Sequence, residues 1–384
     1  MNREAIEEEL LLWIAEPWNA QSERDDARFE RLALALFRFQ YGHCEPYARL
    51  CRSLDRVPEN VMRSEDVPAV PTGAFKEFDL RCFAPGATIL TFQTSGTSTE
   101  RRGRLHLDSL RLYQASLLSS LRTTFLTDLK GRRPPMRFLA PSPIEAPDSS
   151  LTAMFATLAA AEGGEGCGFD LRNGALDLES LAAGIARAHE ADVPLVLAGT
   201  SFAFVHFLDA TRADTAGAWK LPGGSRVMET GGFKGRSREV SREKLRADLA
   251  TRLGLHEASV VNQYGMTELA SQFYDSTLID RLGPRRKLTP PWARVRLVDP
   301  DTGDAVEPGE VGLVVVHDLA NTGSVAAIQT ADLGRAVPAG SPTDGVKGCP
   351  GFDLIGRAEG IEQRGCSIAA DVMLEAAAEH GATG

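Results

Sequence analysis

The stretch Ser259-Val-Val-Asn-Gln-Tyr-Gly-Met-Thr-Glu268 joins a short apolar run to a polar loop. Residues 259–262 predict a buried β-strand, because a short apolar run there ends at a glycine-containing turn. In the loop, Tyr264 can stack on a flat ring, Thr267 can donate to a phosphate and Glu268 can hold Mg²⁺. A strand-to-helix turn capped by Thr267 explains the same residues, so this stretch alone leaves both interpretations open.

A second loop, Thr94-Ser-Gly-Thr-Ser-Thr-Glu-Arg-Arg-Gly-Arg104, follows a strand predicted over residues 87–92 and precedes a helix predicted over 110–121. Its glycines allow backbone N–H groups to converge on an anion, and its hydroxyl groups add short donors to phosphate oxygens. It is not a Walker loop, because no Gly-Lys-Ser/Thr closes it. By itself it indicates either a phosphate-binding loop or a solvated turn.

Two further segments, Gln329-Thr-Ala-Asp-Leu-Gly334 and Asp353-Leu-Ile-Gly-Arg357, carry carboxylates in the last part of the chain. A carboxylate just past a hairpin can accept hydrogen bonds from the hydroxyl groups of a ribose. A lone aspartate at such a place is also a common turn residue, so neither segment decides the function alone.

Strand and helix signals alternate along the middle of the chain, which predicts an α/β architecture. A β-rich piece is expected at about residues 290–340, with a hairpin built by residues 293–298 and 312–317 around an Asp/Pro/Gly turn. The alanine- and glycine-rich residues 159–168 and 343–351 are expected to be flexible loops. The other predicted strands are 136–140, 193–198 and 226–229, and the other predicted helices are 5–14, 29–39, 151–161, 202–210 and 237–253.

The 384 residues carry 42 basic and 52 acidic side chains, and 43% of them are hydrophobic. This composition is that of a globular protein with one large domain or two smaller ones. The net charge of −10 argues against nucleic-acid binding. No membrane span is expected, because no run reaches roughly 18 apolar residues, and the N-terminus does not resemble a signal peptide. The six cysteines form no CxxC pair, so reduced thiols in the cytoplasm are expected.

Taken together and in this order, the four motifs resemble those of the adenylate-forming superfamily, whose acyl and aryl ligases activate carboxylates with ATP. Val67-Pro-Ala-Val-Pro-Thr-Gly-Ala-Phe-Lys76 and Arg364-Gly-Cys-Ser367 are similar to segments of the LuxE-type acyl-protein synthetases of bacterial bioluminescence. The resemblance implies an α/β fold, with an adenylate-forming N-terminal core of mixed sheets and helices over residues 1–350 and the β-rich piece as a subdomain. Residues 351–384 would form a truncated C-terminal segment, too short for the lysine-bearing C-terminal domain of full-length ligases.

The resemblance also implies roles for individual residues. Cys366 matches the cysteine that accepts the acyl group as a thioester, and Glu268 matches the residue that holds Mg²⁺. The phosphate loop has arginines where many superfamily members carry a lysine, so the role of that lysine would pass to an arginine. The ATP- and AMP-binding residues that the resemblance implies are Thr94, Ser95, Gly96, Thr97, Ser98, Thr99, Gly231, Gly232, Tyr264, Gly265, Thr267, Glu268, Asp332 and Arg357.

The implied function is a two-step ligase with ATP and Mg²⁺ as cofactors. A carboxylic acid, with a long-chain fatty acid favoured over an aryl acid, would become an acyl-AMP and then a thioester on Cys366. The acyl group would pass to a partner, either an acyl-accepting reductase or a carrier protein. An alternative keeps the adenylation but transfers the acyl group directly to coenzyme A or to a carrier protein. The acyl chain length, the partner and the oligomeric state are not specified by these motifs.

Two other classes of function stay open from the residues. Gly199-Thr-Ser-Phe-Ala203 stands between a predicted strand and a predicted helix, as the nucleophile elbow of a serine hydrolase would. The elbow requires a glycine where this chain has Ala203, and the superfamily has a Gly-Thr loop at this point that borders the acyl group. A nucleotide-binding protein without activity is the other alternative, and the joint presence of Glu268 and Asp332 argues against it.

Overall fold

The structure is a computed structural model, and it describes residues 1–20, 22, 24–94, 101–129, 131–215, 217–231, 240–338 and 351–358. The chain divides into two compact units. Unit 1 draws its described residues from Met1–Ser119, Met266–Gln272 and Leu288–Gly384, and unit 2 consists of Ser120–Gly265 and Phe273–Lys287. The motif that begins at Tyr264 and ends at Glu268 therefore contributes residues to both units.

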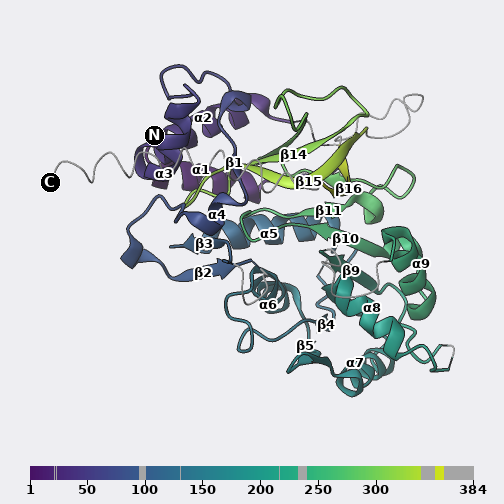
Figure 1. The fold of residues 1–384 in the computed structure, drawn as a ribbon. Helices are drawn as coiled ribbons and strands as arrows, with labels where there is room; N and C mark the ends of the chain where they lie inside the picture. Colours follow the sequence, from purple (N-terminus) through teal and green to yellow (C-terminus); the bar gives the residue numbers. More distant parts are fainter. Residues whose placement is uncertain are drawn as a thin grey trace. The chain divides into compact units, whose positions relative to one another are not determined.

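Unit 2 is built on a sheet with the strand order β5-β4-β8-β9-β10-β11 (Figure 1). All of these pairs are parallel except the last, in which β11 runs antiparallel to β10. The alternation of strands and helices predicted from the sequence is confirmed in this unit. The strands are β4 (Met136–Leu139), β5 (Gly168–Phe169), β8 (Val196–Thr200), β9 (Arg226–Thr230), β10 (Val260–Tyr264) and β11 (Phe273–Asp275), with a separate small pair, β6 (Leu171–Arg172) and β7 (Ala175–Leu176).

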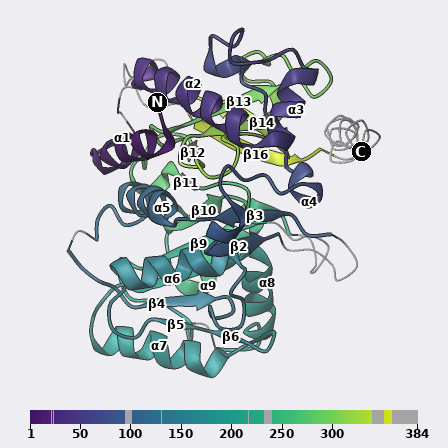
Figure 2. The same ribbon diagram turned by 90° about the vertical axis from the view of Figure 1, so that its left-hand side faces the viewer.

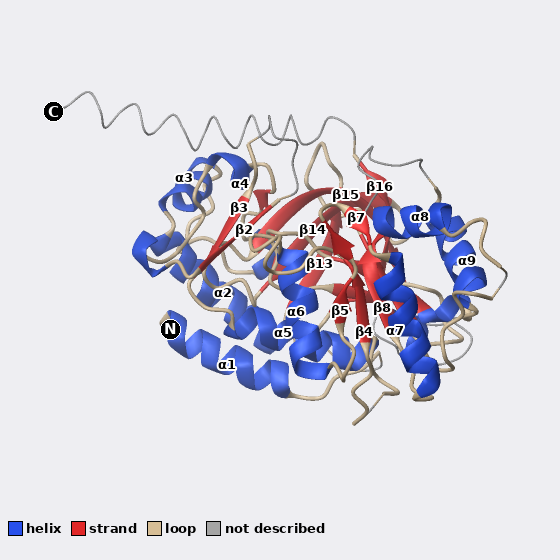
Figure 3. Cartoon of the chain, turned by 90° about the horizontal axis from the view of Figure 1, so that it is seen from below, coloured by secondary structure: helices blue, strands red, loops and turns tan. Residues whose placement is uncertain are grey.

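Helices cover both faces of this sheet (Figure 3). On one face, the ring of Phe155 in α6 (Ser150–Glu162) stacks on that of Phe138 in β4, with ring centroids 4.9 Å apart. Leu139, the next residue of β4, belongs instead to the apolar core formed with α7, α8 and α9. Successive side chains of a strand point to opposite faces, so this alternation places α6 opposite the other three helices. The bounds of those helices are α7 (Leu178–Glu190), α8 (Ser201–Ala210) and α9 (Arg242–Leu253).

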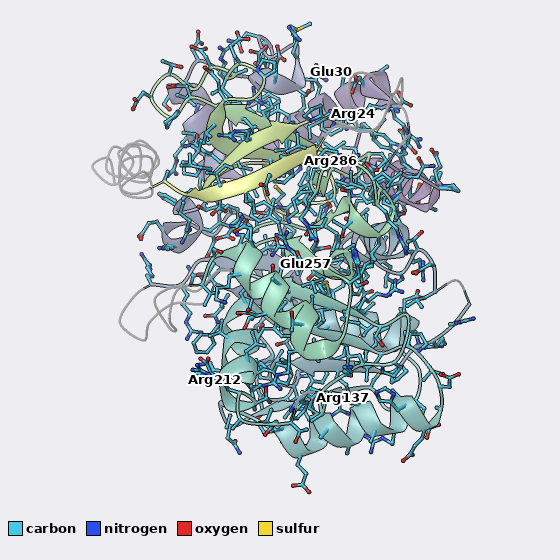
Figure 4. All side chains as sticks on the ribbon, turned by 90° about the vertical axis from the view of Figure 1, so that its right-hand side faces the viewer. Arg24, Glu30, Arg137, Arg212, Glu257 and Arg286 are labelled. Carbon is cyan, nitrogen blue, oxygen red and sulfur yellow. The ribbon has the colours of Figure 1, made fainter. Side chains whose placement is uncertain are left out.

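A buried ion pair ties β4 to the start of α7 inside unit 2. The guanidinium of Arg137 (Figure 4) bonds the carboxylate of Asp170 and donates to the hydroxyl of Ser180, 2.7 Å away. Gly184 in α7 packs against it, since a Cβ there would stand 3.0 Å from Cδ of Arg137. Both charges are paired and hydrogen-bonded, which is the condition for burying them without a large loss of stability.

The sheet strands of unit 1 have the order β13-β14-β15-β16, in which neighbouring strands are antiparallel, and β1 pairs with β15 in parallel. The hairpin expected in the β-rich piece is confirmed as β13 paired with β14. A smaller antiparallel pair, β2 and β3, stands apart from this sheet. The bounds are β1 (Val70–Pro71), β2 (Leu90–Gln93), β3 (Arg104–Leu107), β13 (Ala293–Val298), β14 (Val311–Asp318), β15 (Ala327–Val337) and β16 (Gly351–Arg357), with β12 (Lys287–Leu288) at the boundary between the units.

The N-terminal helices pack on these strands of unit 1 (Figure 2). The side chain of Gln40 in α2 donates to the carbonyl of Asn321 at 2.9 Å and accepts from the N–H of Ala326 at 3.0 Å, so it links the helix to the connection between β14 and β15. Side chains of Asn2 and Asp25 cap the first turns of α1 and α2. The helices of this part are α1 (Arg3–Ala15), α2 (Asp26–His43), α3 (Glu45–Ser53), α4 (Ala74–Glu77) and α5 (Arg111–Thr124), the last of which crosses into unit 2.

The structure corrects several sequence-based predictions. Residues 159–168 are not a loop throughout, because α6 continues to Glu162 and β5 begins at Gly168; alanine favours the helix, and Gly163 caps its end. The strand expected at 87–92 starts only at Leu90. Helix α7 was not predicted. The loop expected at 343–351 lies outside the described residues except for Gly351, which begins β16.

None of the helices within the described ranges has the length and apolar character that would let it cross a bilayer.

Candidate active site

The predicted phosphate loop connects β2 to β3, and the ends of this connection are held together. The N–H of Thr94 donates to the carbonyl of Gly103, and the N–H of Gly103 donates to Oγ1 of Thr94, both at 2.9 Å. Ser95, Gly96, Thr97, Ser98 and Thr99 lie outside the described residues. The sequence did not predict β3. This strand pairs antiparallel with β2, so the described end of the connection leads into a strand and not directly into a helix.

The carboxylate of Glu268 lies beside the base of this loop. A Cβ added at Gly103 would stand 3.1 Å from Cγ2 of Thr94 and 3.5 Å from Oε1 of Glu268. Two residues predicted from separate motifs, Thr94 and Glu268, are therefore brought together within unit 1 around a glycine. The absence of a side chain at Gly103 is what leaves space next to the carboxylate.

The segment Met266–Gln272, which carries Thr267 and Glu268, is fixed by two polar side chains that follow or end β14. The carboxylate of Asp318 accepts from the N–H groups of Ala270 (2.9 Å) and Ser271 (2.7 Å) and from the Ser271 hydroxyl (2.7 Å). Nδ2 of Asn321 donates to the carbonyl of Glu268 at 2.9 Å. The sequence analysis missed both residues, because their partners are about fifty positions away in the chain.

Asp332 and Arg357 are brought together on neighbouring strands of unit 1. They are directly paired in the register of β15 and β16, and Nε of Arg357 is 3.5 Å from Oδ1 of Asp332. Asp332 was expected just past a hairpin, but it lies inside the long strand β15. The guanidinium is 59% exposed, so this pair contributes little to stability and can respond to a ligand.

The predicted adenine-contacting residues of unit 2 follow one another on adjacent strands. The register pairs Thr230 with Gln263, so Gly231 and Tyr264 occupy the carboxyl ends of the parallel strands β9 and β10. Gly231 has φ +81°, a conformation that glycine adopts without strain. The ring of Tyr264 packs near that of Phe273, and the two ring centroids are 6.0 Å apart. Gly265 ends this group within unit 2, and Gly232 lies outside the described residues.

The serine of the proposed elbow has a different partner from that of a hydrolase. Ser201 begins α8 and is 3% exposed. Its Oγ lies 2.5 Å from Oε2 of Glu229 and 3.0 Å from the carbonyl of Gly231. A serine nucleophile needs a base that removes its proton, usually a histidine, within hydrogen-bonding distance. The hydrogen bonds found here do not support the hydrolase interpretation.

Four of the six cysteines lie in the described residues. Cys44, Cys51 and Cys82 are buried, and Cys167 is half-buried. Burial raises the pKa of Cys51 to about 12 and also raises the pKa of Cys167. Because the thiolate is the nucleophile, the sites of Cys51 and Cys167 do not favour an acyl-accepting cysteine. Cys349 and Cys366 lie outside the described residues.

Two arginines of the phosphate loop are in ion pairs. Arg101 bonds Glu77 at 2.7 Å, and Arg104 bonds Asp79 at 2.9 Å. Within the described ranges, no group of three or more His, Cys, Asp or Glu side chains is arranged to hold a metal ion. The carboxylate of Glu268 is an oxygen ligand of the kind that Mg²⁺ prefers, and proteins usually bind this ion through one or two carboxylates together with phosphate oxygens and water.

Comparison with solved structures places this fold among the adenylate-forming ligases. A 2-hydroxyisobutyryl-CoA ligase in an open conformation, in complex with 2-HIB-AMP and CoA, superposes with a TM-score of 0.62 at 16% identity and covers 90% of this chain and 80% of its own. The same ligase in the postadenylation state gives a TM-score of 0.62, also at 16% identity, over 90% of this chain and 72% of its own. The fold class predicted from the sequence is confirmed.

The sequence comparisons identify the family. The sequence model of the acyl-protein synthetase family LuxE matches residues 172–377, which is more than half of the chain. The chain therefore belongs to the LuxE acyl-protein synthetase family, and it is an acid–thiol ligase that activates acyl groups. It is 23% identical over 366 residues to a long-chain-fatty-acid–luciferin-component ligase of Aliivibrio fischeri, covering 93% of this chain and 92% of that one. A ligase of the same description from Photorhabdus luminescens is 27% identical over 88 residues, or 23% of this chain and 75% of that one.

Proposed function

We propose that this ligase activates a long-chain fatty acid with ATP and transfers the acyl group to its own Cys366. The observation that carries the proposal is the meeting of Thr94 and Glu268 around Gly103 in a chain of this family. These residues come from two motifs separated by more than 160 positions, and both were predicted as nucleotide ligands. The fatty-acid part of the proposal rests on the ligases of Aliivibrio fischeri and Photorhabdus luminescens.

In the first step, a carboxylate oxygen of the acid attacks the α-phosphorus of ATP. An O–P bond forms, the bond from this phosphorus to the bridging oxygen breaks, and pyrophosphate leaves with that electron pair. The carboxylate is already ionised at neutral pH, so this step needs no general base. What the protein must supply is alignment of the two reactants and stabilisation of charge on the departing group.

The residues that the sequence predicts as nucleotide ligands would have distinct roles in this step. The loop that Thr94 begins would bind the phosphates, together with Thr267. Its other phosphate-binding residues would be Ser95, Gly96, Thr97, Ser98 and Thr99. Mg²⁺ would be held through Glu268 and would supply positive charge next to the phosphate oxygens. The adenine would lie against Gly231, Gly232, Tyr264 and Gly265, and the ribose hydroxyl groups would bond Asp332, with Arg357 donating nearby.

In the second step, the thiolate of Cys366 attacks the carbonyl carbon of the acyl-AMP. A C–S bond forms, the C–O bond to the phosphate breaks, and AMP leaves. Burial of Cys44, Cys51 and Cys82 supports this choice, because these thiols are enclosed by the protein. Residues 351–384, carrying Cys366, would then act as the acyl-bearing segment of an adenylating core over 1–350. The thioester would next pass its acyl group to a reductase or a carrier protein.

The exchange of labelled pyrophosphate into ATP, measured across a panel of carboxylic acids, tests this function. We expect exchange that depends on Mg²⁺ and is fastest with long-chain fatty acids. Fastest exchange with aryl acids would contradict the proposed fatty-acid substrate but would still support adenylation of a carboxylic acid. AMP release that requires coenzyme A and is unchanged in the Cys366→Ser variant would show that the acyl group goes to coenzyme A.

A methyl group at Gly103 tests the packing around the phosphate loop. We expect Gly103→Ala to reduce kcat/KM for ATP in the exchange reaction about fivefold, or about 1 kcal/mol, because Thr94 must move away from the new Cβ. Gly86→Ala is the matched control, since a Cβ there meets no atom within 4 Å. Equal exchange by the two variants would show that the space beside Glu268 is not used.

A further inference from the structure

Three polar side chains meet at the carboxyl ends of adjacent parallel strands in unit 2. Ser201 follows β8, Glu229 lies near the end of β9 and Asn262 lies in β10. Oγ of Ser201 is 2.5 Å from Oε2 of Glu229, and Nδ2 of Asn262 donates to Oε1 of Glu229 at 2.6 Å. Ligands of parallel α/β sheets bind at this edge. None of these three residues is among the predicted adenine contacts.

The hydrogens available to this group limit how its contacts can be satisfied. A serine hydroxyl has one hydrogen to donate. Ser201 Oγ nevertheless lies close to three acceptor oxygens: Oε2 of Glu229, the carbonyl of Gly231 at 3.0 Å and, more distantly, the carbonyl of Thr230 at 3.4 Å. If the Glu229 carboxylate is ionised, Ser201 can satisfy only one of them. If Oε2 carries a proton, it donates to Ser201, and Ser201 donates to the carbonyl of Gly231.

We infer that Glu229 is a neutral carboxylic acid and that Ser201 relays its hydrogen bond to the carbonyl of Gly231, which fixes the backbone at the adenine site. This inference rests on the proposed function for the role of Gly231. In this arrangement Asn262 donates to the second carboxyl oxygen, so both carboxyl oxygens of Glu229 and the hydroxyl of Ser201 have partners. Ser201 and Glu229 are then positioning residues, which act on the nucleotide through Gly231.

The surroundings of Glu229 agree with a neutral side chain. The carboxyl group is buried, and burial raises its pKa. Among the charged groups that face it, Lys287 favours the ionised form and Asp275 opposes it, but burial has the larger effect. Lys287 is moreover bonded to Asp275, as is Arg285. A carboxylic acid kept neutral in this way can donate a hydrogen bond near neutral pH.

Two variants separate a neutral Glu229 from an ionised one. Glu229→Gln keeps the shape and supplies an N–H donor for Ser201 and an oxygen for Asn262, so we expect KM for ATP within about twofold of the parent protein. Ser201→Ala leaves the Gly231 carbonyl without its donor, and we expect KM for ATP to rise roughly three- to tenfold with no change in KM for the acid. Glu257→Gln is the matched control, because this glutamate of unit 2 is exposed (Figure 4). A Glu229→Gln protein that fails to fold, or whose KM for ATP rises tenfold, would overturn the inference.

An infrared difference spectrum of the parent protein against Glu229→Gln provides a readout that needs no substrate. At neutral pH we expect the C=O stretching band of a protonated carboxyl group in the parent protein and its loss in the variant. A difference spectrum that shows the bands of an ionised carboxylate would overturn the inference. Absence of pyrophosphate exchange in the parent protein would contradict the proposed function alone, since the band is measured without catalysis.

Discussion

A Cys366→Ser protein incubated with labelled long-chain fatty acid, ATP and Mg²⁺ is expected to retain no hydroxylamine-sensitive label. The thiolate is a far better nucleophile toward an acyl-AMP than a serine hydroxyl group. Any ester formed on the new serine would also resist neutral hydroxylamine. Pyrophosphate exchange should stay within about twofold of the parent protein, because the first step does not use the thiol.

Cys349→Ser and Cys167→Ser are the matched controls for this experiment. Both should carry the same amount of label as the parent protein. Label that persists in Cys366→Ser and disappears in Cys349→Ser would show that Cys349, and not Cys366, accepts the acyl group. Label that persists in all three variants would contradict a cysteine acyl carrier at these positions.

The substitution Glu268→Gln is expected to lower kcat for pyrophosphate exchange on the order of 10²–10³-fold. The amide keeps the size of the side chain and removes the negative charge that would hold Mg²⁺ beside the phosphates. The carbonyl of residue 268 still accepts from Asn321, so the fold of the segment should be preserved. Raising the Mg²⁺ concentration should restore part of the activity, which distinguishes loss of a metal ligand from loss of structure.

Glu59→Gln is a suitable control for that substitution, because Glu59 is an exposed glutamate of the same unit. Its exchange rate should equal that of the parent protein. An unchanged rate in Glu268→Gln, or an equal loss in both variants, would contradict the role of Glu268.

The sequence was most informative where one short stretch contains both a strand signal and the polar residues of a predicted binding motif. The strand–loop patterns around residues 94 and 264 predicted strands that end in polar loops, and the structure places Thr94 near Glu268 and Gly231 next to Tyr264 in register. The hairpin of the β-rich piece was equally clear, because Asp, Pro and Gly residues specify such a turn locally.

Contacts between distant residues could not be predicted in the same way. Asp318 accepts from Ser271, 47 positions away, and nothing near Asp318 in the sequence indicates this partner. Ser201 was considered as a nucleophile because a serine between a strand and a helix has the same local pattern in many proteins. Its role depends on Glu229, 28 positions further along the chain. Helix α7 was not predicted. It contains Gly184, a weak helix former in sequence terms, whose contact with Arg137 is visible only in the structure.

The way in which the chain contributes to the two units has a consequence during synthesis on the ribosome. Unit 2 comes from one nearly continuous stretch, whereas unit 1 combines Met1–Ser119 with a part that begins at Leu288. At roughly 5–20 residues per second, the N-terminal helices wait on the order of ten seconds or more for the strands that they cover. During that interval the apolar sides of α1 and α2 have no native partner in β13–β15. Chaperone dependence and aggregation of the nascent chain are therefore expected to depend on the first 119 residues more than on unit 2.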